Sequence, residues 1–589
     1  MRRSTRRSLV LLVTVAGLGL TASGVFRSAN AISSENPEII RQGSRNLQQE
    51  VREYNNLMYN VLLEVGRGYY KDIDVGDIAI AGIKGMMASL DPYSDFYVEE
   101  IDPGLVADME ITTTGTYSGI GSTIGYSGGV LSIIAPMKGS PSMMAGLLAG
   151  DIIAEIDGEP SKSFSTAKAA SLIKGPAGTD VTLMIEREGF PDALEFVITR
   201  AQIEVNDVSA ATFAAPGIAY IEISRFSKNT GQFLVEAIEK LGREQTIEGL
   251  ILDLRGNPGG LLDEAIAVTE PFLPPGEMIV YTRGRVPNMN ENYLSRERQL
   301  YDGRLVVMVN QASASASEII AGAVQDLDRG IVVGKTSFGK GLVQVVGQMG
   351  RMPDGNGANI FRLTAGEYFT ASGRNLQRPF GTDDLGRIVI RNPGDQDSTD
   401  HPIFLSQRGR EVTGGGGVVP DIELDGIMGN ILLFDLKFRR GIFLRYVNNY
   451  VNTRNVAEGT TVSVNDELLD DFRAWAEAQG FSFETPTEMR LDDLVETASA
   501  EGADDAMAAE ITALQRAIDR QKDSMWQESR ESIALELRRE FVTRLQGYDA
   551  GLMAYFSKDP QFQAALEVLG DRAQYAAVLS GESVGGQDK

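Results

Sequence analysis

Cysteine is absent from this chain of 589 residues, and histidine occurs once, at His401. These two absences exclude a cysteine nucleophile, a disulfide bond and a zinc site built from cysteine and histidine. A hydrolase with a serine, histidine and aspartate triad would depend on His401, which lies in the polar segment Asp400-His401-Pro402, far in sequence from any nucleophile motif. If the chain is a covalent hydrolase, we therefore expect lysine to be its base.

Positive charge is also scarce, with 55 lysines and arginines against 81 acidic residues and a net charge of −26. No basic stripe stands out in the body of the chain, so a nucleic-acid partner is not expected, because phosphate binding needs clustered lysine or arginine. The composition, 43% hydrophobic and 23% charged, is that of a globular protein. A chain of this length exceeds what one hydrophobic core organises, and we expect two or three units.

The first 31 residues have the pattern of an export signal. Four arginines lie within the first seven residues, an apolar run follows from Leu9 to Leu20, and Ala29-Asn30-Ala31 has the small residues of a signal-peptidase site. The stretch between Arg7 and Arg27 carries no charge, so residues 1–31 are either a cleaved signal peptide or an uncleaved membrane anchor. In both cases we expect an exported protein, periplasmic or otherwise extracytoplasmic, and in the second case one anchored to the inner membrane.

The rest of the chain divides by its pattern of apolar residues. Residues 36–110 have helical periodicity, residues 111–190 have short apolar strands between glycine-rich turns, and residues 430–580 are mostly helical and acidic. Between them, residues 200–425 alternate strands and helices, which indicates an α/β layer with a partly parallel sheet. The predicted fold class is therefore α/β and multi-domain.

A serine-rich turn in this α/β region is the first candidate for chemistry. The buried strand Leu305–Val309 leads into a segment that contains Ser313, Ser315 and Ser317 and opens a helix at about Ser315. A serine at such a turn projects from the sheet edge, and the free N–H groups of the helix start can stabilise an oxyanion. All three serines are candidates on this ground.

Two further strand ends add a base and more backbone donors. Lys340, between Gly339 and Gly341, follows the strand Ile331–Val333, and burial against apolar neighbours would lower its pKa enough to make a neutral amine available. The segment Leu252–Gly260 ends another strand with exposed N–H groups. Each feature alone has a structural explanation, as a helix cap or a tight turn, but three of them on strand ends of one α/β unit favour a catalytic site.

Together these segments resemble the C-terminal processing peptidases, also called tail-specific proteases. The resemblance covers about residues 40–425, and its motifs occur in the family's order. They are Leu90-Asp91-Pro92-Tyr93-Ser94, a PDZ segment, Asp253–Gly260, Ser313–Glu318, Gly339–Gln344, Leu363-Thr364 with Ser372-Gly373, and Gly416–Asp421.

The resemblance implies a Ser315 nucleophile, a Lys340 general base and a Gln344 that orients the lysine. Ser315 is preferred to Ser313 and Ser317 because it is the central serine of the family motif and keeps the family's distance to Lys340. The resemblance also implies an oxyanion hole, made by the N–H groups of Gly259 and Ala316, with Gly260 as the alternative to Gly259. Glu318 and Asp326 are expected to support the site, and neither a metal nor an organic cofactor is expected.

The resemblance also identifies residues 111–190 as a PDZ domain inserted ahead of a serine peptidase core at 200–425. Gly119, Ile120 and Gly121 look like its carboxylate-binding loop, where a peptide's C-terminus would bind. In the family, a basic residue before a Gly-x-x-Gly segment, often arginine, relays peptide binding to the active site. Lys174 occupies this position and is expected to be regulatory, although lysine lacks the planar guanidinium with which arginine makes bidentate hydrogen bonds.

The function implied by this resemblance is that of a serine endopeptidase that binds apolar C-terminal tails and cleaves exported polypeptides. The alternatives are a catalytically inactive PDZ scaffold and an envelope binding protein. The terminal helices are expected to mediate dimerisation or substrate access, so a homo-oligomer such as a dimer is expected.

Overall fold

The computed structural model describes residues 37–99, 101–127, 129–351, 358–383, 387–390, 401–427, 429–439 and 441–581. The predicted export signal or anchor, residues 1–31, lies outside these ranges. Among the residues within them, no helix is both long enough and apolar enough to cross a membrane.

A six-stranded sheet forms the centre of the α/β core, with the strand order β10-β11-β12-β15-β16-β23. β10 is antiparallel to β11, and every other neighbouring pair is parallel. Strands covered on both faces are continuous apolar runs, and β12 is buried along its whole length. The bounds are β10 Val208–Ala215, β11 Ile218–Ile223, β12 Gly249–Asp253, β15 Arg304–Val309, β16 Ile331–Gly334 and β23 Ile422–Glu423.

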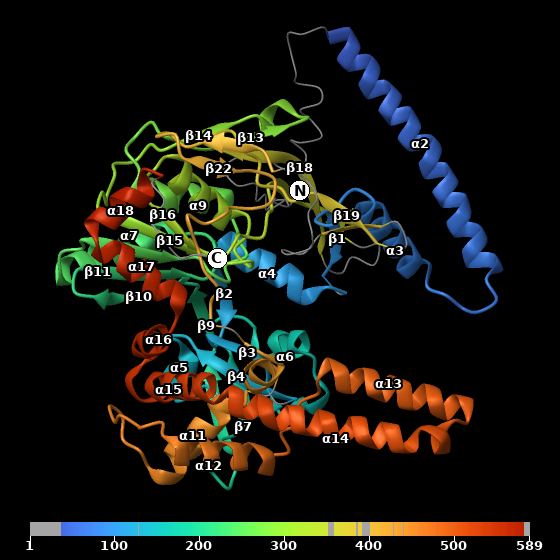
Figure 1. Ribbon diagram of the computed structural model, residues 1–589. Coiled ribbons are helices and arrows are strands. Elements are labelled where there is room, and N and C mark those ends of the chain that lie inside the picture. The colour runs from blue at the N-terminus through green and yellow to red at the C-terminus, as the bar shows by residue number, and fades with distance from the viewer. Residues whose placement is uncertain are drawn as a thin grey trace, which may run out of the picture.

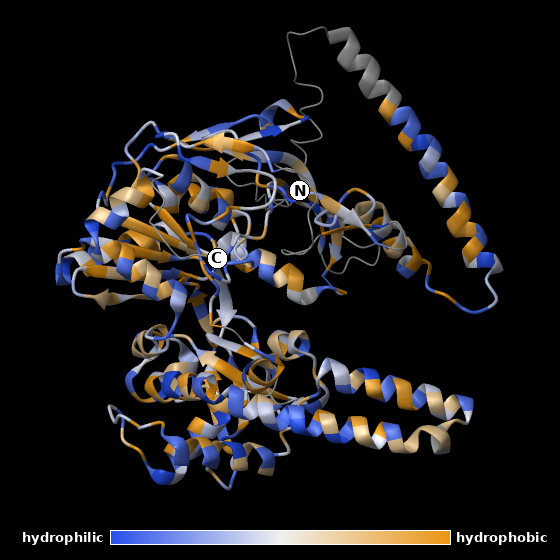
Figure 2. Cartoon of the chain, viewed as in Figure 1, coloured by the Kyte–Doolittle hydropathy of each residue, from blue (hydrophilic) through white to orange (hydrophobic). Residues whose placement is uncertain are grey.

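Helices from two distant parts of the chain cover the two faces of this sheet (Figure 1). One face packs against α7 (Thr230–Glu244), α8 (Leu262–Thr269) and α9 (Ala316–Asp326), which alternate with the strands. The other face packs against α16 (Tyr548–Phe556), α17 (Pro560–Gly570) and α18 (Arg572–Leu579). The last helices of the predicted C-terminal region thus complete the α/β core, and Figure 2 shows the apolar strands between the two helical layers.

A two-stranded stem, β2 (Thr116–Gly119) with β9 (Ala201–Glu204), joins the glycine-rich module to the core (Figure 1). The module has the strand order β3-β4-β5-β7-β8, with β6 paired to β5, around its own apolar core. β3 ends this order. The bounds are β3 Ser122–Ser127, β4 Val130–Pro136, α5 Pro141–Ala145, β5 Ile152–Ile156, β6 Glu159–Pro160, α6 Thr166–Ile173, β7 Asp180–Glu186 and β8 Leu194–Thr199.

A second sheet joins the N-terminal region to the α/β core, because β1 pairs with β18. Its order is β1-β18-β13-β14, and β17 pairs with β18. The N-terminal region, expected to be helical, therefore also contributes the strand β1. The bounds are α2 Pro37–Gly68, α3 Val75–Ala88, β1 Asp95–Val98, α4 Pro103–Thr114, β13 Met278–Gly284, β14 Asn292–Leu294, β17 Leu342–Arg351 and β18 Ala358–Thr370.

The remaining helices form a body with its own aromatic-rich core. Two of these helices, α14 and α15, follow each other directly and meet at Ser529, whose backbone has φ −87° and ψ 0°. Its hydroxyl accepts a hydrogen bond from Asn430 at 2.7 Å, which holds this turn. The bounds are α10 Ile431–Phe434, α11 Ile442–Arg454, α12 Asp466–Ala478, α13 Pro486–Glu501, α14 Asp504–Glu528 and α15 Arg530–Gln546.

Helix α11 of this body contacts the glycine-rich module. Arg445 forms an ion pair with Glu188 at 2.8 Å, and the Asn448 side chain donates to the Ala149 carbonyl at 2.5 Å. Gly150, at φ 88°, leaves room for this contact, because a Cβ there would lie 2.4 Å from Asn448. The module is therefore held both by its stem and by α11.

Candidate active site

Ser315 lies at the N-cap of α9, where β15 and its following loop turn into the helix. Its backbone has φ 55° and ψ −111°, a conformation that costs a non-glycine residue energy and persists only when the surroundings enforce it. The strain turns Ser315 outward: it is partly exposed, whereas Ala316 and the rest of α9 are buried. The N-terminal N–H groups of α9 lie beside it.

The neighbouring serines are both fully buried and both hold backbone segments together. The Ser313 hydroxyl donates to the Leu254 carbonyl at 2.8 Å, and the Ser317 hydroxyl donates to the Asn257 carbonyl at 3.0 Å. Their hydroxyl protons are therefore engaged away from any substrate. Burial separates the three candidates, and only Ser315 faces solvent.

Lys340 lies in the turn just before β17, with its side chain against aromatic and polar neighbours. Its ammonium donates to Gln344 Oε1 at 2.9 Å and lies 4.8 Å from the centre of the Tyr93 ring. Burial lowers the pKa of Lys340 to about 8, and the Arg362 guanidinium acts in the same direction. Within the described chain, no hydrogen bond joins this ammonium to the Ser315 hydroxyl, as is common before substrate binds.

The motif Leu90–Ser94 orients Gln344. The amide nitrogen of Gln344 donates to the Tyr93 carbonyl at 3.0 Å, and so leaves Oε1 to accept from Lys340. Asp91 holds this loop by accepting from the backbone N–H groups of Tyr93 and Ser94. The N-terminal region thus supplies part of the surroundings of the lysine.

The Glu318 carboxylate links the serine turn to the lysine turn. It is fully buried, and it accepts from the backbone N–H of Ser315 at 2.8 Å, that of Lys340 at 2.9 Å and that of Gly339 at 2.7 Å. The Ser337 hydroxyl donates to it at 2.6 Å. Burial raises the pKa of Glu318, while these hydrogen bonds favour the charged form and oppose the rise.

A second link between the two turns comes from Tyr368 on β18. Its hydroxyl lies within hydrogen-bonding distance of the Ser315 carbonyl, at 3.2 Å, and of the Lys340 carbonyl. Glu318 binds the N–H groups of the same two residues. The backbones of Ser315 and Lys340 are therefore joined on both sides by buried polar groups.

Gly259 packs directly against the serine turn. A Cβ at Gly259, where φ is 97°, would lie 2.8 Å from Ser315 Cβ and 3.0 Å from the Ala316 nitrogen, so only glycine fits. The Gly259 N–H donates to Asn257 Oδ1 at 2.9 Å, and an oxyanion would share this donor with Asn257 or take it. Gly260, the alternative donor, forms an isolated parallel β-bridge with Phe226.

Of the carboxylate-loop residues, Gly119 ends β2, and Ile120 and Gly121 lie between β2 and β3, with Ile120 buried in the module's core. Lys174 follows α6 and lies near this loop, with its ammonium 5.5 Å from the centre of the Tyr117 ring. Burial lowers the pKa of Lys174, while Asp108 and Glu110 of α4 oppose the shift. Lys174 is therefore placed between the module and the core helix that leads into it.

Two further residues considered in the sequence, Asp326 and His401, have structural contacts. Asp326 forms a fully buried ion pair with Arg374 at 2.7 Å and accepts from the Ser372 N–H at 2.9 Å. His401 has its Nδ1 atom 3.2 Å from the Gly414 carbonyl. Neither residue contacts Ser315 or Lys340 through any hydrogen bond found among the described residues.

Three contributors to the site were missed by reasoning from sequence: Tyr93, Asn257 and Tyr368. Tyr93 and Asn257 stand inside motifs that were recognised, so motif membership was an available signal. Tyr368 lies on β18, and nothing in its local sequence indicates the carbonyl contacts that its hydroxyl makes.

Family models match three parts of the chain: "Peptidase family S41" at residues 217–384, "PDZ domain" at 132–187, and "Probable PDZ-protease, C-terminal helical domain" at 434–569. Among curated proteins, a "Carboxy-terminal-processing protease" of Bartonella bacilliformis is 35% identical over 63% of this chain and 82% of its own length. A "Carboxyl-terminal-processing protease" of Synechocystis is 37% identical over 50% and 68%. The "Carboxy-terminal processing protease CtpA" of Bacillus subtilis is 30% identical over 64% and 76%. These matches confirm the resemblance found in the motifs, and the chain belongs to the carboxy-terminal-processing proteases, serine-type peptidases that carry a PDZ domain.

Proposed function

We propose that this protease cleaves exported polypeptides with free apolar C-termini, and that Ser315, Lys340 and Gln344 perform the cleavage. The observation that carries the proposal is the Lys340–Gln344 hydrogen bond of 2.9 Å at a lysine whose pKa is lowered to about 8. A substantial fraction of such an amine is neutral near physiological pH and can accept a proton.

In the proposed reaction, the neutral Lys340 amine takes the Ser315 hydroxyl proton as the serine oxygen attacks the scissile carbonyl. The carbonyl π electrons move to its oxygen, and the N–H groups of Gly259 and Ala316 stabilise this oxyanion. As the oxyanion collapses, the C–N bond breaks and the Lys340 ammonium gives its proton to the leaving amine. Water then attacks the acyl-enzyme with the same lysine as base, and Ser315 is released with its proton restored.

The PDZ domain would select the substrate. A peptide would add as a strand beside β3, which ends the order of its sheet, and place its carboxylate at the N–H groups of Gly119, Ile120 and Gly121. Export through residues 1–31, and a homo-oligomer such as a dimer, remain part of the proposal. The inactive scaffold and the envelope binding protein are not favoured, because the chain belongs to serine-type peptidases.

The test is a cleavage assay with an unfolded protein that ends in apolar residues. We expect the wild-type protein to cut it, and both Ser315→Ala and Lys340→Met to reduce the rate by at least about a thousandfold. Ser317→Ala is the matched control, because this neighbouring hydroxyl is buried in a structural bond. Equal cutting by the wild-type protein and Ser315→Ala would remove Ser315 from the mechanism.

Gating through Lys174 is tested separately with a free peptide that ends in an apolar residue. If binding at the PDZ domain activates the enzyme through Lys174, the peptide should accelerate cleavage by the wild-type protein but not by Lys174→Ala. Lys168→Ala is the control, because Lys168 lies on helix α6, which ends just before Lys174. Equal acceleration in all three proteins would remove Lys174 from the relay.

A further inference from the structure

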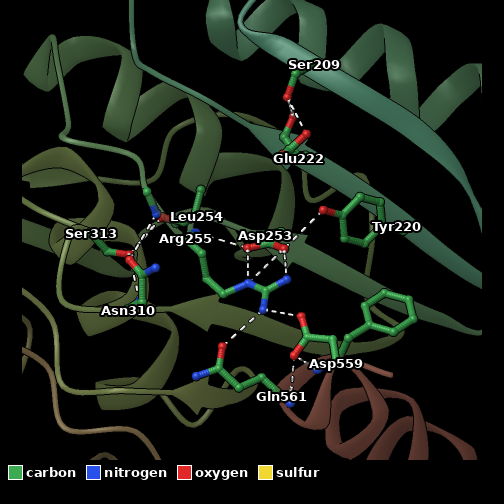
Figure 3. A network of polar contacts seen from close by, with 12 residues as sticks. Ser209, Tyr220, Glu222, Asp253, Leu254, Arg255, Asn310, Ser313, Asp559 and Gln561 are labelled. Carbon is green, nitrogen blue, oxygen red and sulfur yellow. Dashed lines mark hydrogen bonds and ion pairs between the residues drawn. The ribbon is translucent and has the colours of Figure 1, made fainter. Parts of the chain in front are cut away.

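The loop that carries Gly259 is held at its start by Arg255. This residue follows β12, and its guanidinium binds the Asp253 carboxylate through Nε at 3.0 Å and Nη2 at 2.8 Å (Figure 3). The carbonyl of the preceding residue, Leu254, accepts a hydrogen bond from the Ser313 hydroxyl, in the serine turn, at 2.8 Å. Arg255 therefore stands at the point where the oxyanion loop leaves the sheet, next to the turn that presents Ser315.

The third guanidinium nitrogen of Arg255 binds at the start of α17, whose N-cap residue Asp559 lies 304 residues later in the chain. Its Nη1 atom donates to Asp559 Oδ2 at 2.5 Å and to Gln561 Oε1 at 3.0 Å (Figure 3). Asp559 uses its other oxygen as the N-cap of α17, accepting from the N–H groups of Gln561 and Phe562. One carboxylate thus ties the arginine to a helix start.

This contact is sheltered from water, so it is not a weak surface pair. The side chains of Arg255, Asp253 and Asp559 are 15%, 4% and 3% exposed. The guanidinium also lies 5.4 Å from the centre of the Phe556 ring, on α16. Charge-assisted hydrogen bonds with this geometry are strong and fix orientation, because the planar guanidinium meets each acceptor in one direction.

We propose that Asp559 is a positioning residue for catalysis: through Arg255, it sets the place of the oxyanion loop against Ser315. The inference rests on the proposed function of Gly259 as an oxyanion donor. The start of α17, on the face of the sheet opposite α9, thereby acts on the oxyanion loop through Arg255. An oxyanion donor displaced by a fraction of an ångström stabilises the transition state less well, while binding of the ground-state peptide at the distant PDZ domain is unchanged.

The first test is Asp559→Asn, which keeps a good N-cap for α17 but replaces the charged acceptor of Arg255 by a neutral amide. We expect kcat to fall on the order of tenfold with KM unchanged, since Asp253 still holds the guanidinium. Asp571→Asn is the matched control, because Asp571 caps α18 in the same way, through the N–H groups of Ala573 and Gln574. If Asp559 has only a structural role, Asp559→Asn should lower the melting temperature more than Asp571→Asn, because Asp559 is buried and Asp571 is exposed, but kcat of the folded enzyme should stay unchanged.

A second variant tests whether the lost kcat can be restored. Gln561→Glu in the Asp559→Asn background returns a carboxylate to the atom that already accepts from Arg255 at 3.0 Å, but it removes the Gln561 Nε2 donation to the Leu424 carbonyl, so kcat should recover in part. Wild-type kcat in Asp559→Asn, or equal losses in Asp559→Asn and Asp571→Asn, would overturn the proposal.

Hydrogen exchange separates failure of this inference from failure of the proposed function. If the wild-type protein does not cleave, the cleavage mechanism is wrong, but the loop can still be followed. Amides of residues 254–261 should then exchange faster in Asp559→Asn than in Asp571→Asn, and equal exchange in the two variants would show that Asp559 does not position the loop.

Discussion

The Lys340 ammonium donates to Gln344 Oε1 at 2.9 Å, and the nitrogen of the same Gln344 amide donates to the Tyr93 carbonyl at 3.0 Å. A glutamine held at its nitrogen end can present only its oxygen to the lysine. Because a side-chain amide is neutral, it orients the amine without stabilising the positive charge as a carboxylate would. The pKa of Lys340 can therefore stay low while its direction is set.

The pH dependence of cleavage should follow Lys340. Its pKa is lowered to about 8, so the amine is mostly protonated below that pH and cannot accept the Ser315 proton. We expect kcat/KM to rise about tenfold per pH unit below pH 8 and to level off above it. The measurement is kcat/KM from pH 5.5 to 10 with a substrate that has no group titrating in this range. A profile that is flat through pH 8 would contradict a lysine base.

Gln344→Glu should move that profile to higher pH. The new carboxylate would lie at the atom 2.9 Å from the ammonium, and an opposite charge so close raises a lysine pKa by about one unit or more. Gln348→Glu is the control, because Gln348 lies on the same strand β17 and is exposed. If Gln344→Glu keeps the wild-type midpoint, Gln344 does not contact the catalytic amine in the working enzyme.

Glu318→Gln should impair both stability and turnover. Each Glu318 oxygen accepts two hydrogen bonds, and a glutamine has only one acceptor, so two buried donors would lose their partner at a cost of about 1–3 kcal/mol each. The turns of Ser315 and Lys340 would then separate, and kcat should fall more than tenfold. Thermal unfolding and kcat of the folded fraction are the measurements.

The control for that change is Glu488→Gln. Glu318 is the N3 residue of a capping box at the start of α9, and Glu488 is the N3 residue of a capping box at the start of α13, in the helical body. We expect it to lower the melting temperature slightly and to leave kcat unchanged. Equal kcat for Glu318→Gln and the wild-type protein would show that the carboxylate does not hold the two turns in place.

The contact between the PDZ domain and α11 should depend on the pair Arg445 and Glu188, 2.8 Å apart. Glu188→Arg places two cations together, and amides of the turns around Ala149 and Glu188 should exchange faster with solvent. The double variant Glu188→Arg with Arg445→Glu should restore slow exchange. Unchanged exchange in Glu188→Arg would mean that the stem of β2 and β9 holds the domain alone.

Local patterns in the sequence were sufficient to name the candidate site residues and to predict most strands and helices. The lack of cysteine and the isolated His401 directed attention to a lysine base, and the apolar runs at Leu305–Val309 and Ile331–Val333 predicted strands that are present as β15 and β16. Such inferences succeed because residue type and hydrophobic period act over a few neighbouring residues. The family motifs are local in the same sense.

Tertiary structure decided what depends on contacts between distant segments. Burial distinguishes Ser315 from Ser313 and Ser317, which residue type and hydrophobic period alone could not do. The helices α16 to α18 look like any amphipathic helices, and only packing assigns them to the face of the core sheet. The bond between Arg255 and Asp559 crosses 304 positions, and its two partners meet because both the strand β12 and the helix α17 are buried against the same core. Hydrophobic periodicity carries no information about contacts between distant segments, because it indicates which face of a segment is buried but not which other segment covers that face.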